Sequence, residues 1–436
     1  MAKIRKEIAD RACDIASLET LAKAERDGVE TCFARMDAQE TQCGFGLGGV
    51  CCRICHMGPC RITKKAPRGV CGADADTIVA RNFLREVVGG VAAHSDHGRH
   101  LALLLKQVAL GRAPVQEIRD EPALRRAARW YGIDEAGRDT SAVALDLADL
   151  MLAEFTAQET PLLTLALAPV KQQTVWQAQD IAPAGIDRTV VESMHRTHMG
   201  VDHDYRSLLL QAFRTSLADG WGGSRLATTI SDILFGTPAP IRSQANLGVL
   251  GADTVNIVVH GHEPELSEML AIAAREPETL AAARAAGAAG VTLAGICCTA
   301  NEILMRHGIP VAGNFLQQEL AVVTGAVELM LIDVQCCMPS LPQVAAAFTH
   351  LGFPAYFRVE LSWAKLFGVV VLLAPVPARL KEWAYAGFAI DLGSALIAHL
   401  SVGDGPESWG WAAGTGVLWG LSYFFWRRLQ AAPASA

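Results

Sequence analysis

Half of the twelve cysteines lie close together in a glycine-rich segment near the start of the chain, at Cys43, Cys51, Cys52, Cys55, Cys60 and Cys71. Iron–sulfur cubanes need four soft thiolates converging from a loop, and short C-x2-C and C-x4-C steps are typical of such loops. All twelve cysteines precede residue 338, and the chain starts with a charged helical pattern in place of an apolar export signal. We therefore expect a reducing cytosolic compartment, where clustered cysteines favour metal binding over the alternative of disulfides.

The cysteines of this block divide into a complete set of four and a remaining pair. One complete set would be Cys52, Cys55, Cys60 and Cys71. The neighbours Cys51 and Cys52 tend to project in different directions, so we expect them to serve different clusters. Cys43 and Cys51 then supply only half a ligand set, and a second copy of the chain is the natural donor of the other half. A structural zinc site is the alternative for the set of four, but it leaves the pair unexplained.

Three histidines recur every third residue at His94, His97 and His100. On a helix this spacing makes one slowly drifting stripe. Imidazoles titrate near neutral pH and can pass protons, which makes the stripe a candidate proton relay. Taken alone, such a stripe is more often an ordinary solvated face.

Three predicted strands each end in residues that can bind metal, at His260–His262, Cys297–Cys298 and Cys336–Cys337. Sites in open α/β sheets form outside the carboxyl ends of strands, so these residues should converge. A single buried cysteine is more often a small core residue. Three consecutive strand ends favour one metal site instead.

The elements that would position these residues change character along the chain. Residues 1 to about 40 predict helix, and the pattern from Ala75 to about Ile233 is mostly helical. From about residue 245, short apolar runs alternate with amphipathic helices, including one predicted helix over 266–287. The fold class expected is α/β with a helical N-terminal domain, a partial Rossmann-like parallel sheet and an apolar all-α C-terminal tail.

Long motifs in the front of the chain resemble the anaerobic nickel–iron carbon monoxide dehydrogenases. They are TCFARMDAQETQCGFGLGGVCCRICHMGPCRI and GVCGADADTIVARN, followed later by VHGHEPELSEM, GICCTANEILMRHGIP and DVQCCMPSL. In that family the set of four holds a [4Fe–4S] cluster inside each subunit. The remaining pair and its mate across a twofold axis hold a second, shared [4Fe–4S] cluster, which implies a homodimer.

The same resemblance implies roles for the histidines and the strand ends. The histidine stripe would move protons to and from the active site, with His94 as the innermost acid/base residue. His262, Cys298 and Cys336 would bind part of a nickel–iron–sulfur cluster, with the other histidine and the second cysteine of each pair next best. The family reaction is oxidation of CO with water to CO2, two protons and two electrons, which pass to a ferredoxin-like acceptor.

The last part of the chain has a different composition, with six of the nine tryptophans after residue 360 and no cysteine. Three apolar stretches cover roughly 362–376, 383–402 and 409–426, and the last two approach the ~20 residues that cross a bilayer. Basic loops would lie on one side of the membrane, as the positive-inside bias expects. A buried helical bundle is the alternative for this tail.

The tail resembles the DoxX-like family of small membrane proteins, and it stands where the family's second Rossmann-like domain is expected. That domain supplies three further cysteine ligands and a catalytic lysine. The join near Phe348–Leu351 has no Gly-, Pro- or Ser-rich linker, which predicts a chimeric or misassembled gene product. Membrane contact is expected through residues 362–426.

The domains predicted are a mainly helical Fe–S domain over 1–235, a Rossmann-like domain over 236–348 and a tail over 349–436. The formal net charge of −7 gives no basic footprint for nucleic acid. We expect a carbon monoxide dehydrogenase by descent that is cytoplasmic through 1–348 and inactive as written. The alternatives are a non-catalytic Fe–S electron-transfer protein and a membrane-anchored interaction protein.

Overall fold

The computed structural model divides the chain into two compact units, Met1–Phe348 and Thr349–Ala436. It describes residues 8–39, 41–113 and 116–350, and in the tail only 381–382, 385, 413–417, 419–420, 422–424 and 426–427. All twelve cysteines are among the described residues, and all are free thiols.

The front of the first unit is less regular than one continuous helix. Its short helices are α1 (Ile15–Asp27), α2 (Cys32–Ala38) and α3 (Gly44–Leu47), and a 3₁₀ turn covers Ile8–Asp10. The helix predicted over residues 1–40 is interrupted because Gly28 adopts the left-handed conformation (φ 68°) and caps α1. The glycine-rich loop also contains a small antiparallel hairpin of β1 (Cys51–Cys52) and β2 (Cys60–Arg61).

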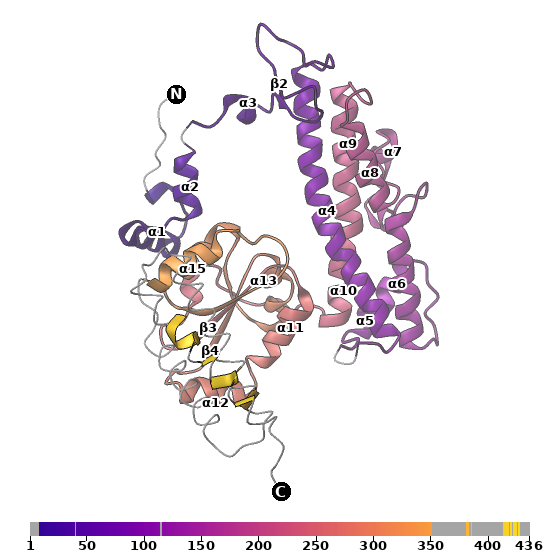
Figure 1. Ribbon diagram of the computed structural model, residues 1–436. Helices are drawn as coiled ribbons and strands as arrows, with labels where there is room; N and C mark the ends of the chain where they lie inside the picture. The colour runs from indigo at the N-terminus through magenta and orange to yellow at the C-terminus, as the bar shows by residue number, and fades with distance from the viewer. Residues whose placement is uncertain are drawn as a thin grey trace. The chain divides into compact units, whose positions relative to one another are not determined.

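A helical body follows, built around the 35-residue helix α4 (Ala75–Ala109), which Figure 1 shows running beside α9. The Asp74 side chain caps α4 by accepting a hydrogen bond from the Thr77 amide at 2.9 Å. The other helices of this body are α5 (Glu121–Trp130), α6 (Thr140–Thr156), α7 (Val170–Ala178), α8 (Ile186–Arg196), α9 (Tyr205–Ala218) and α10 (Ser224–Phe235). A 3₁₀ turn covers Leu163–Leu167. The core between α4, α5, α6 and α10 consists mainly of buried Leu, Ala, Val and Ile side chains, together with Met151, Phe155 and Tyr131.

One short segment of π-helix, Asp219–Gly223, joins α9 to α10 and passes very close to α4. A Cβ atom at Gly98 would lie 2.6 Å from the carbonyl oxygen of Gly223, and one at Gly223 would collide with Ser95. Only glycine permits this crossing. It brings the α4 histidines beside Asp219 and α10, and π-helical segments are frequent at functional sites.

The remainder of the first unit is the predicted parallel sheet, in the order β5-β4-β3-β6. Its strands are β3 (Val255–His260), β4 (Val291–Ile296), β5 (Val311–Gly313) and β6 (Val327–Ile332). Its helices are α11 (Pro264–Ala273), α12 (Pro277–Ala285), α13 (Cys298–Glu302), α14 (Gln318–Val323) and α15 (Leu341–His350). Short 3₁₀ turns cover Leu247–Val249, Leu304–His307 and Phe315–Gln317.

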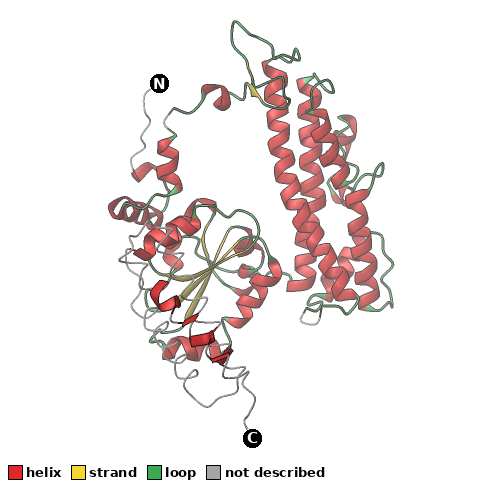
Figure 2. Cartoon of the chain, viewed as in Figure 1, coloured by secondary structure: helices red, strands yellow, loops and turns green. Residues whose placement is uncertain are grey.

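The two faces of the sheet are covered by different helices, as the pleat of its strands requires (Figure 2). Val258 points to a core with Leu21 of α1 and Leu320 of α14. Its neighbour Val259 points to the opposite core, with Ala271 of α11 and Leu304. The parallel α/β class predicted from the sequence is therefore confirmed.

Three details differ from the sequence prediction. The single helix expected over 266–287 is two helices, because Pro277 disfavours helical geometry at Glu276 and starts α12 instead. The short strand β5 was not predicted, since three residues carry too little pattern. The third predicted strand ends at Ile332, four residues before Cys336, because the chain turns through positive φ at Gln335 and Cys336.

Candidate metal centres

The four cysteines predicted as a complete set line one small cavity at the start of the helical body. The hairpin register pairs Cys52 with Cys60, and the loops that follow bring Cys55 and Cys71 to the same space. The other lining residues are Ile54, Gly58, Gly69, Ala73, Ile78, Arg81 and Met199. A largely apolar cavity with four sulfur donors fits the ligand chemistry of an iron–sulfur cubane.

Glycine and backbone amides shape this cavity. A Cβ at Gly58 would lie 3.1 Å from both the Cys52 carbonyl oxygen and the Cys60 nitrogen, so the loop closes tightly there. The Val70 amide donates to the Cys60 sulfur at 3.4 Å. A hydrogen bond from the Ala73 amide is the main reason that the pKa of Cys71 is lowered. Both amides favour the thiolate, which is the form that binds metal.

Arg81 is a buried cation beside this cavity that the sequence analysis did not single out. Its side chain is 1% exposed, and Nη2 donates to the Asp202 carbonyl at 2.8 Å. Its Nη1 lies 4.0 Å from the Cys71 sulfur, and its Nε is buried without a hydrogen-bond partner. A fixed positive charge here would offset part of the negative charge of four thiolates. The only sequence signal is its position on α4, two turns after the Asp74 cap.

Cys43 and Cys51 lie outside the four-cysteine cavity. Cys43 is exposed at the start of α3, where hydrogen bonds from the Gly46 and Phe45 amides lower its pKa. Cys51 and the buried Cys52 are consecutive on β1, so their side chains point to opposite faces of the hairpin. The Asn82 amide donates to the Gly49 and Cys51 carbonyls at 2.9 and 3.0 Å and fixes this part of the loop on α4.

Each histidine of the α4 stripe faces a carboxylate, but the three are enclosed to different degrees. His94 Nδ1 lies 3.2 Å from Asp219, His97 Nε2 lies 3.3 Å from Glu302, and His100 Nε2 lies 3.9 Å from Asp96. Their side chains are 51%, 11% and 62% exposed, respectively. The resemblance implied that His94 is innermost, whereas burial in this structure is greatest at His97. The hydrogen bond with Asp219 raises the pKa of His94.

A larger cavity of about 670 Å³ joins this stripe to two of the strand-end residues. His94 and His97 from α4, His262 after β3 and Cys298 at the start of α13 all line it. The imidazole rings of His97 and His262 meet edge to face with centroids 6.2 Å apart. Predicted proton-transfer residues and predicted metal ligands therefore share one cavity.

The turn that presents His262 is held by a carboxylate from the end of β6. Asp333 accepts hydrogen bonds from the His262 amide at 2.5 Å and the Glu263 amide at 3.0 Å. Gly261 directly precedes His262 and has a φ of 137°, and a side chain at this position would collide with Asp333. Burial lowers the pKa of His262, and its Nδ1 is buried without a hydrogen-bond partner. A neutral imidazole with a free nitrogen suits a metal ligand.

Cys336 does not line the cavity of about 670 Å³ but lies beside the cysteines that follow β4. Burial, then the neighbouring Cys336, raises the pKa of Cys297 to about 12. Burial and Cys336 likewise raise the pKa of Cys298. Cys297 and Cys336 both have positive φ, 65° and 57°, which is uncommon for residues other than glycine and is frequent at functional sites.

The predicted ligand side chains surround cavities and do not converge on the position of a single metal ion. Among the described ranges, no group of three or more His, Cys, Asp or Glu side chains is close enough to hold one metal ion. The four front thiols instead enclose a cavity, as a multi-atom cluster requires. At the strand ends, His262, Cys298 and Cys336 can supply some of the donors of a larger cluster.

Glu302 is a functional candidate that the sequence analysis missed. It lines the cavity of about 670 Å³ one helical turn after Cys298 and accepts a hydrogen bond from Ser231 at 2.6 Å. Burial would raise its pKa, but hydrogen bonds from His97 and Ser231 and the charge of Arg306 outweigh burial and lower it. The i, i+4 spacing of Cys298 and Glu302 was the available signal.

Fold and site together define a protein with a four-cysteine cavity beside its helical body and a second cavity, lined by histidines and Cys298, that the helical body and the parallel sheet share. The sequence profile of the Prismane/CO dehydrogenase family matches residues 50–351, and the chain belongs to this family. Carbon monoxide dehydrogenase 1 of Methanosarcina mazei is 52% identical over 369 residues, covering 82% of this chain and 59% of that protein. The carbon monoxide dehydrogenase of Rhodospirillum rubrum is 45% identical over 421 residues, covering 90% of this chain and 65% of that protein.

Solved structures agree with this assignment. A nickel-free carbon monoxide dehydrogenase from Thermococcus sp. AM4 matches with a TM-score of 0.75 and 50% identity, over 79% of this chain and 55% of that chain. Carbon Monoxide Dehydrogenase IV from Carboxydothermus hydrogenoformans matches with a TM-score of 0.71 and 45% identity, over 75% of this chain and 52% of that chain. The chain thus spans between about half and two-thirds of the length of these relatives.

The tail gives a second family match. The profile of the DoxX-like family matches residues 320–421, which overlaps the first match. The Prismane/CO dehydrogenase match ends at residue 351, in agreement with a resemblance expected over about residues 1–348. Some alignments with relatives cover a larger share of the chain, such as 90% for the Rhodospirillum rubrum protein. Across the part of the chain that the structure describes, no helix is long and apolar enough to cross a membrane. The first predicted span, 362–376, lies outside the described residues, the second has only Tyr385 among them, and the third is described in part.

Proposed function

We propose that this chain carries the electron-transfer clusters and part of the active site of an anaerobic nickel–iron carbon monoxide dehydrogenase. The reaction is CO + H2O to CO2, two protons and two electrons. One observation carries the proposal: His262 and Cys298 line the same cavity as His94 and His97 in a chain 52% identical to a named carbon monoxide dehydrogenase.

The proposed ligands follow the two donor sets. Cys52, Cys55, Cys60 and Cys71 would hold an internal [4Fe–4S] cluster, and Cys43 and Cys51 would share a second with a partner subunit. His262, Cys298 and Cys336 would hold part of a nickel–iron–sulfur cluster, with Cys297 and Cys337 as neighbouring donors. When bound, that cluster supplies Lewis-acid activation of CO and water.

The residues of this chain would carry the protons released by the reaction. His97 lies between His262 and Glu302 and is the most enclosed histidine of the stripe. The lowered pKa of Glu302 keeps it ionised, so it can hold His97 in the orientation and protonation state that accept a proton from the cavity. His94 with Asp219 and His100 with Asp96 offer further, more exposed acid/base pairs on either side of His97 along α4.

Electrons would leave through the internal cluster and then the shared cluster to a ferredoxin-like acceptor. The half set of Cys43 and Cys51 supports a homodimer, because a cubane needs four thiolates. In this proposal, residues 1–235 bind the electron-transfer clusters and residues 236–348 supply the active-site ligands. The tail would contact the membrane, which the DoxX-like match supports. We propose a cytoplasmic location for 1–348.

The 436-residue polypeptide, assayed by itself, should oxidise CO poorly. Its described active-site donors fill only part of a nickel–iron–sulfur cluster, and losing one electrostatic donor alone costs on the order of 10²-fold in rate. The assay is CO-dependent reduction of a viologen dye by anaerobic, nickel-supplied protein. Turnover equal to an intact relative would show that the ligand set is complete, contrary to this proposal.

Metal content and detergent dependence separate the alternatives. Nickel bound beside iron in the same protein supports an assembled active site. Iron in cubanes without nickel favours an electron-transfer protein that keeps only the front clusters. If the chain stays in solution only with detergent, the tail contacts membrane. The chimeric join near Phe348 stays a prediction that sequencing of the genomic locus would test.

A further inference from the structure

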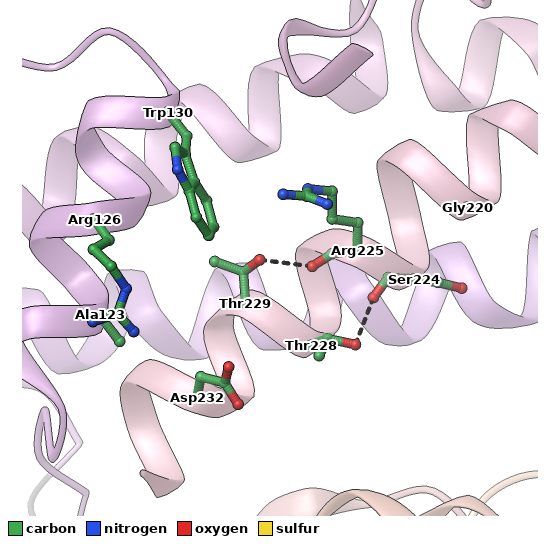
Figure 3. Close-up of a pocket in the computed structure, with 9 residues that line it drawn as sticks. All are labelled: Ala123, Arg126, Trp130, Gly220, Ser224, Arg225, Thr228, Thr229 and Asp232. Carbon is green, nitrogen blue, oxygen red and sulfur yellow. Dashed lines mark hydrogen bonds between the residues drawn. The ribbon is translucent and has the colours of Figure 1, made fainter. Parts of the chain in front are cut away.

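A second cavity, of about 420 Å³, lies between α5 and α10 and has no part in the proposed reaction. Its lining residues are Ala123, Arg126, Trp130, Gly220, Ser224, Arg225, Thr228, Thr229 and Asp232 (Figure 3). The volume falls within the ~300–1,000 Å³ typical of small-molecule sites. Two of the nine residues are arginines, which sets the chemistry of any ligand.

Neither cavity arginine forms an ion pair among the described residues, and the nearby Asp120 carboxylate, which the charge of Arg126 helps to stabilise, accepts a hydrogen bond from Thr237. Among the described residues, the guanidinium groups of Arg126 and Arg225 make no hydrogen bond or ion pair, and Arg225 Nε is buried and unsatisfied. Arg225 is half-buried, and a guanidinium group in such a position is normally paired with a carboxylate. Together with the exposed Arg126 on the same cavity, the unpaired Arg225 leaves a site for an anion.

Neighbouring arginines show that unpaired charge is not the rule in this part of the fold. On the same helix, Arg125 and Arg129 lie 2.6 Å from Glu121 and Glu135, respectively. The carboxylate in the cavity, Asp232, is already paired with Arg306 at 2.9 Å. The local excess of positive charge is therefore confined to the cavity.

The position of Arg225 is fixed by aromatic rings. Its guanidinium carbon lies 5.2 Å from the ring centroids of both Trp130 and Trp221. Stacking between two indoles preorganises the planar group without using its hydrogen-bond donors. Figure 3 shows the Arg225 guanidinium extending from α10 towards Trp130.

The hydroxyl groups in the cavity already donate to protein acceptors, so the arginines are its charged donors. Thr228 donates to the Ser224 carbonyl at 3.0 Å, and Thr229 donates to the Arg225 carbonyl at 2.8 Å (Figure 3). Ser224 donates to Asp219 at 2.9 Å. An anion would thus be held by charge-assisted hydrogen bonds from guanidinium groups, which match phosphate geometry well.

We propose that this cavity binds a small phosphorylated molecule, with its phosphate group held by Arg126 and Arg225. The remaining volume would take the organic part, against Trp130 and Ala123. Three α10 residues, Ser224, Thr228 and Asp232, line both this cavity and the one with His262 and Cys298. The site lies next to the proposed active site but uses none of its ligands or histidines.

The test is isothermal titration of the full chain with inorganic phosphate and with a phosphate monoester, glycerol 1-phosphate, at constant ionic strength. We expect saturable binding, tighter for the monoester, and about 10-fold weaker binding in Arg126→Gln. Arg126 is exposed, so this variant should fold. Arg129→Gln removes one charge from the same helix outside the cavity and should bind as the unaltered chain does.

Other outcomes would overturn the proposal. Acetate binding as tightly as the phosphates would mean a general anion surface and not a phosphate site. Equal losses in Arg126→Gln and Arg129→Gln would assign the effect to net charge alone. If the unaltered chain shows no saturable binding, the cavity is not a phosphate site. If a folded double variant, Arg126→Gln with Arg225→Gln, binds phosphate as tightly as the unaltered chain, the phosphate is bound elsewhere. None of these results depends on metal content or on CO oxidation.

Discussion

The four-cysteine cavity and the His262–Cys298 cavity differ in the distance along the sequence that separates their predicted ligands. The first takes all four thiols from residues 52–71, on one hairpin and the loops beside it. The second draws on α4, the end of β3 and the start of α13, while Cys336 lies apart from it. A site made within one short loop depends little on domain packing, whereas the composite site forms only when helical body and sheet are docked correctly.

The largest effect that would test this comparison is loss of the internal cluster. Cys55→Ser should remove about four irons per chain after anaerobic reconstitution, because four thiolates are all that the front cavity offers. The measurement is iron content together with the broad cubane absorbance. Cys13→Ser is the matched control, since Cys13 is exposed and lines neither cavity. Full iron content in the Cys55 variant would refute the ligand assignment.

A smaller loss of iron is expected from the paired site. Replacing both Cys43 and Cys51 by Ser should remove about one cluster per dimer and leave the internal clusters in place. A site shared across a twofold axis should also support the dimer, so sedimentation velocity on the same samples should show weaker association. A strictly monomeric protein that keeps both cluster types would contradict the shared site.

Replacing the half-buried Glu302 of the composite cavity should lower the stability of the fold more than replacing an exposed glutamate. Glu302→Gln should lower the free energy of unfolding at pH 7 by about 1–3 kcal/mol, because it weakens the hydrogen bonds from His97 and Ser231. Chemical denaturation of the metal-free chain measures this, with Glu117→Gln on the surface as the control.

The pH dependence of this difference follows from the direction of the pKa shift. Since folding lowers the pKa of Glu302 below 4.5, its stabilisation is present above that pH and is lost as the pH falls through the folded value. The difference in the free energy of unfolding between the Glu302→Gln variant and the unaltered chain should therefore shrink as the pH falls. If this difference stays constant down to pH 3, the loss of stability comes from packing and not from the charge of Glu302.

The smallest effect concerns the pair of His94 and Asp219 at the N-terminal end of the histidine stripe. The hydrogen bond with Asp219 raises the pKa of His94, so that pair stabilises the fold below pH 6.5 and less as pH rises through the folded value. Asp219→Asn should return the His94 pKa towards 6.5, as measured by NMR titration of the imidazole. Asp96→Asn, beside His100, should leave His94 unchanged; equal shifts in both variants would point to general charge effects.

The sequence by itself determined the features that are local. Cysteine spacing predicted which four thiols share a cavity, the three-residue histidine repeat predicted a stripe on α4, and short apolar runs between amphipathic helices predicted the parallel sheet. These features need only the periodicity of a helix, the apolar run of a buried strand and the short reach of a loop.

Only the tertiary structure decided which distant side chains meet. The glycine crossing of α4 with the π-helix places His94 beside Asp219, and docking of α13 encloses His97 against Glu302. The position of Arg81 under the front cysteines and the unpaired Arg225 between two indoles likewise depend on packing between separate helices. Burial and electrostatic pairing are set by neighbours remote in sequence, so no local pattern could have predicted them.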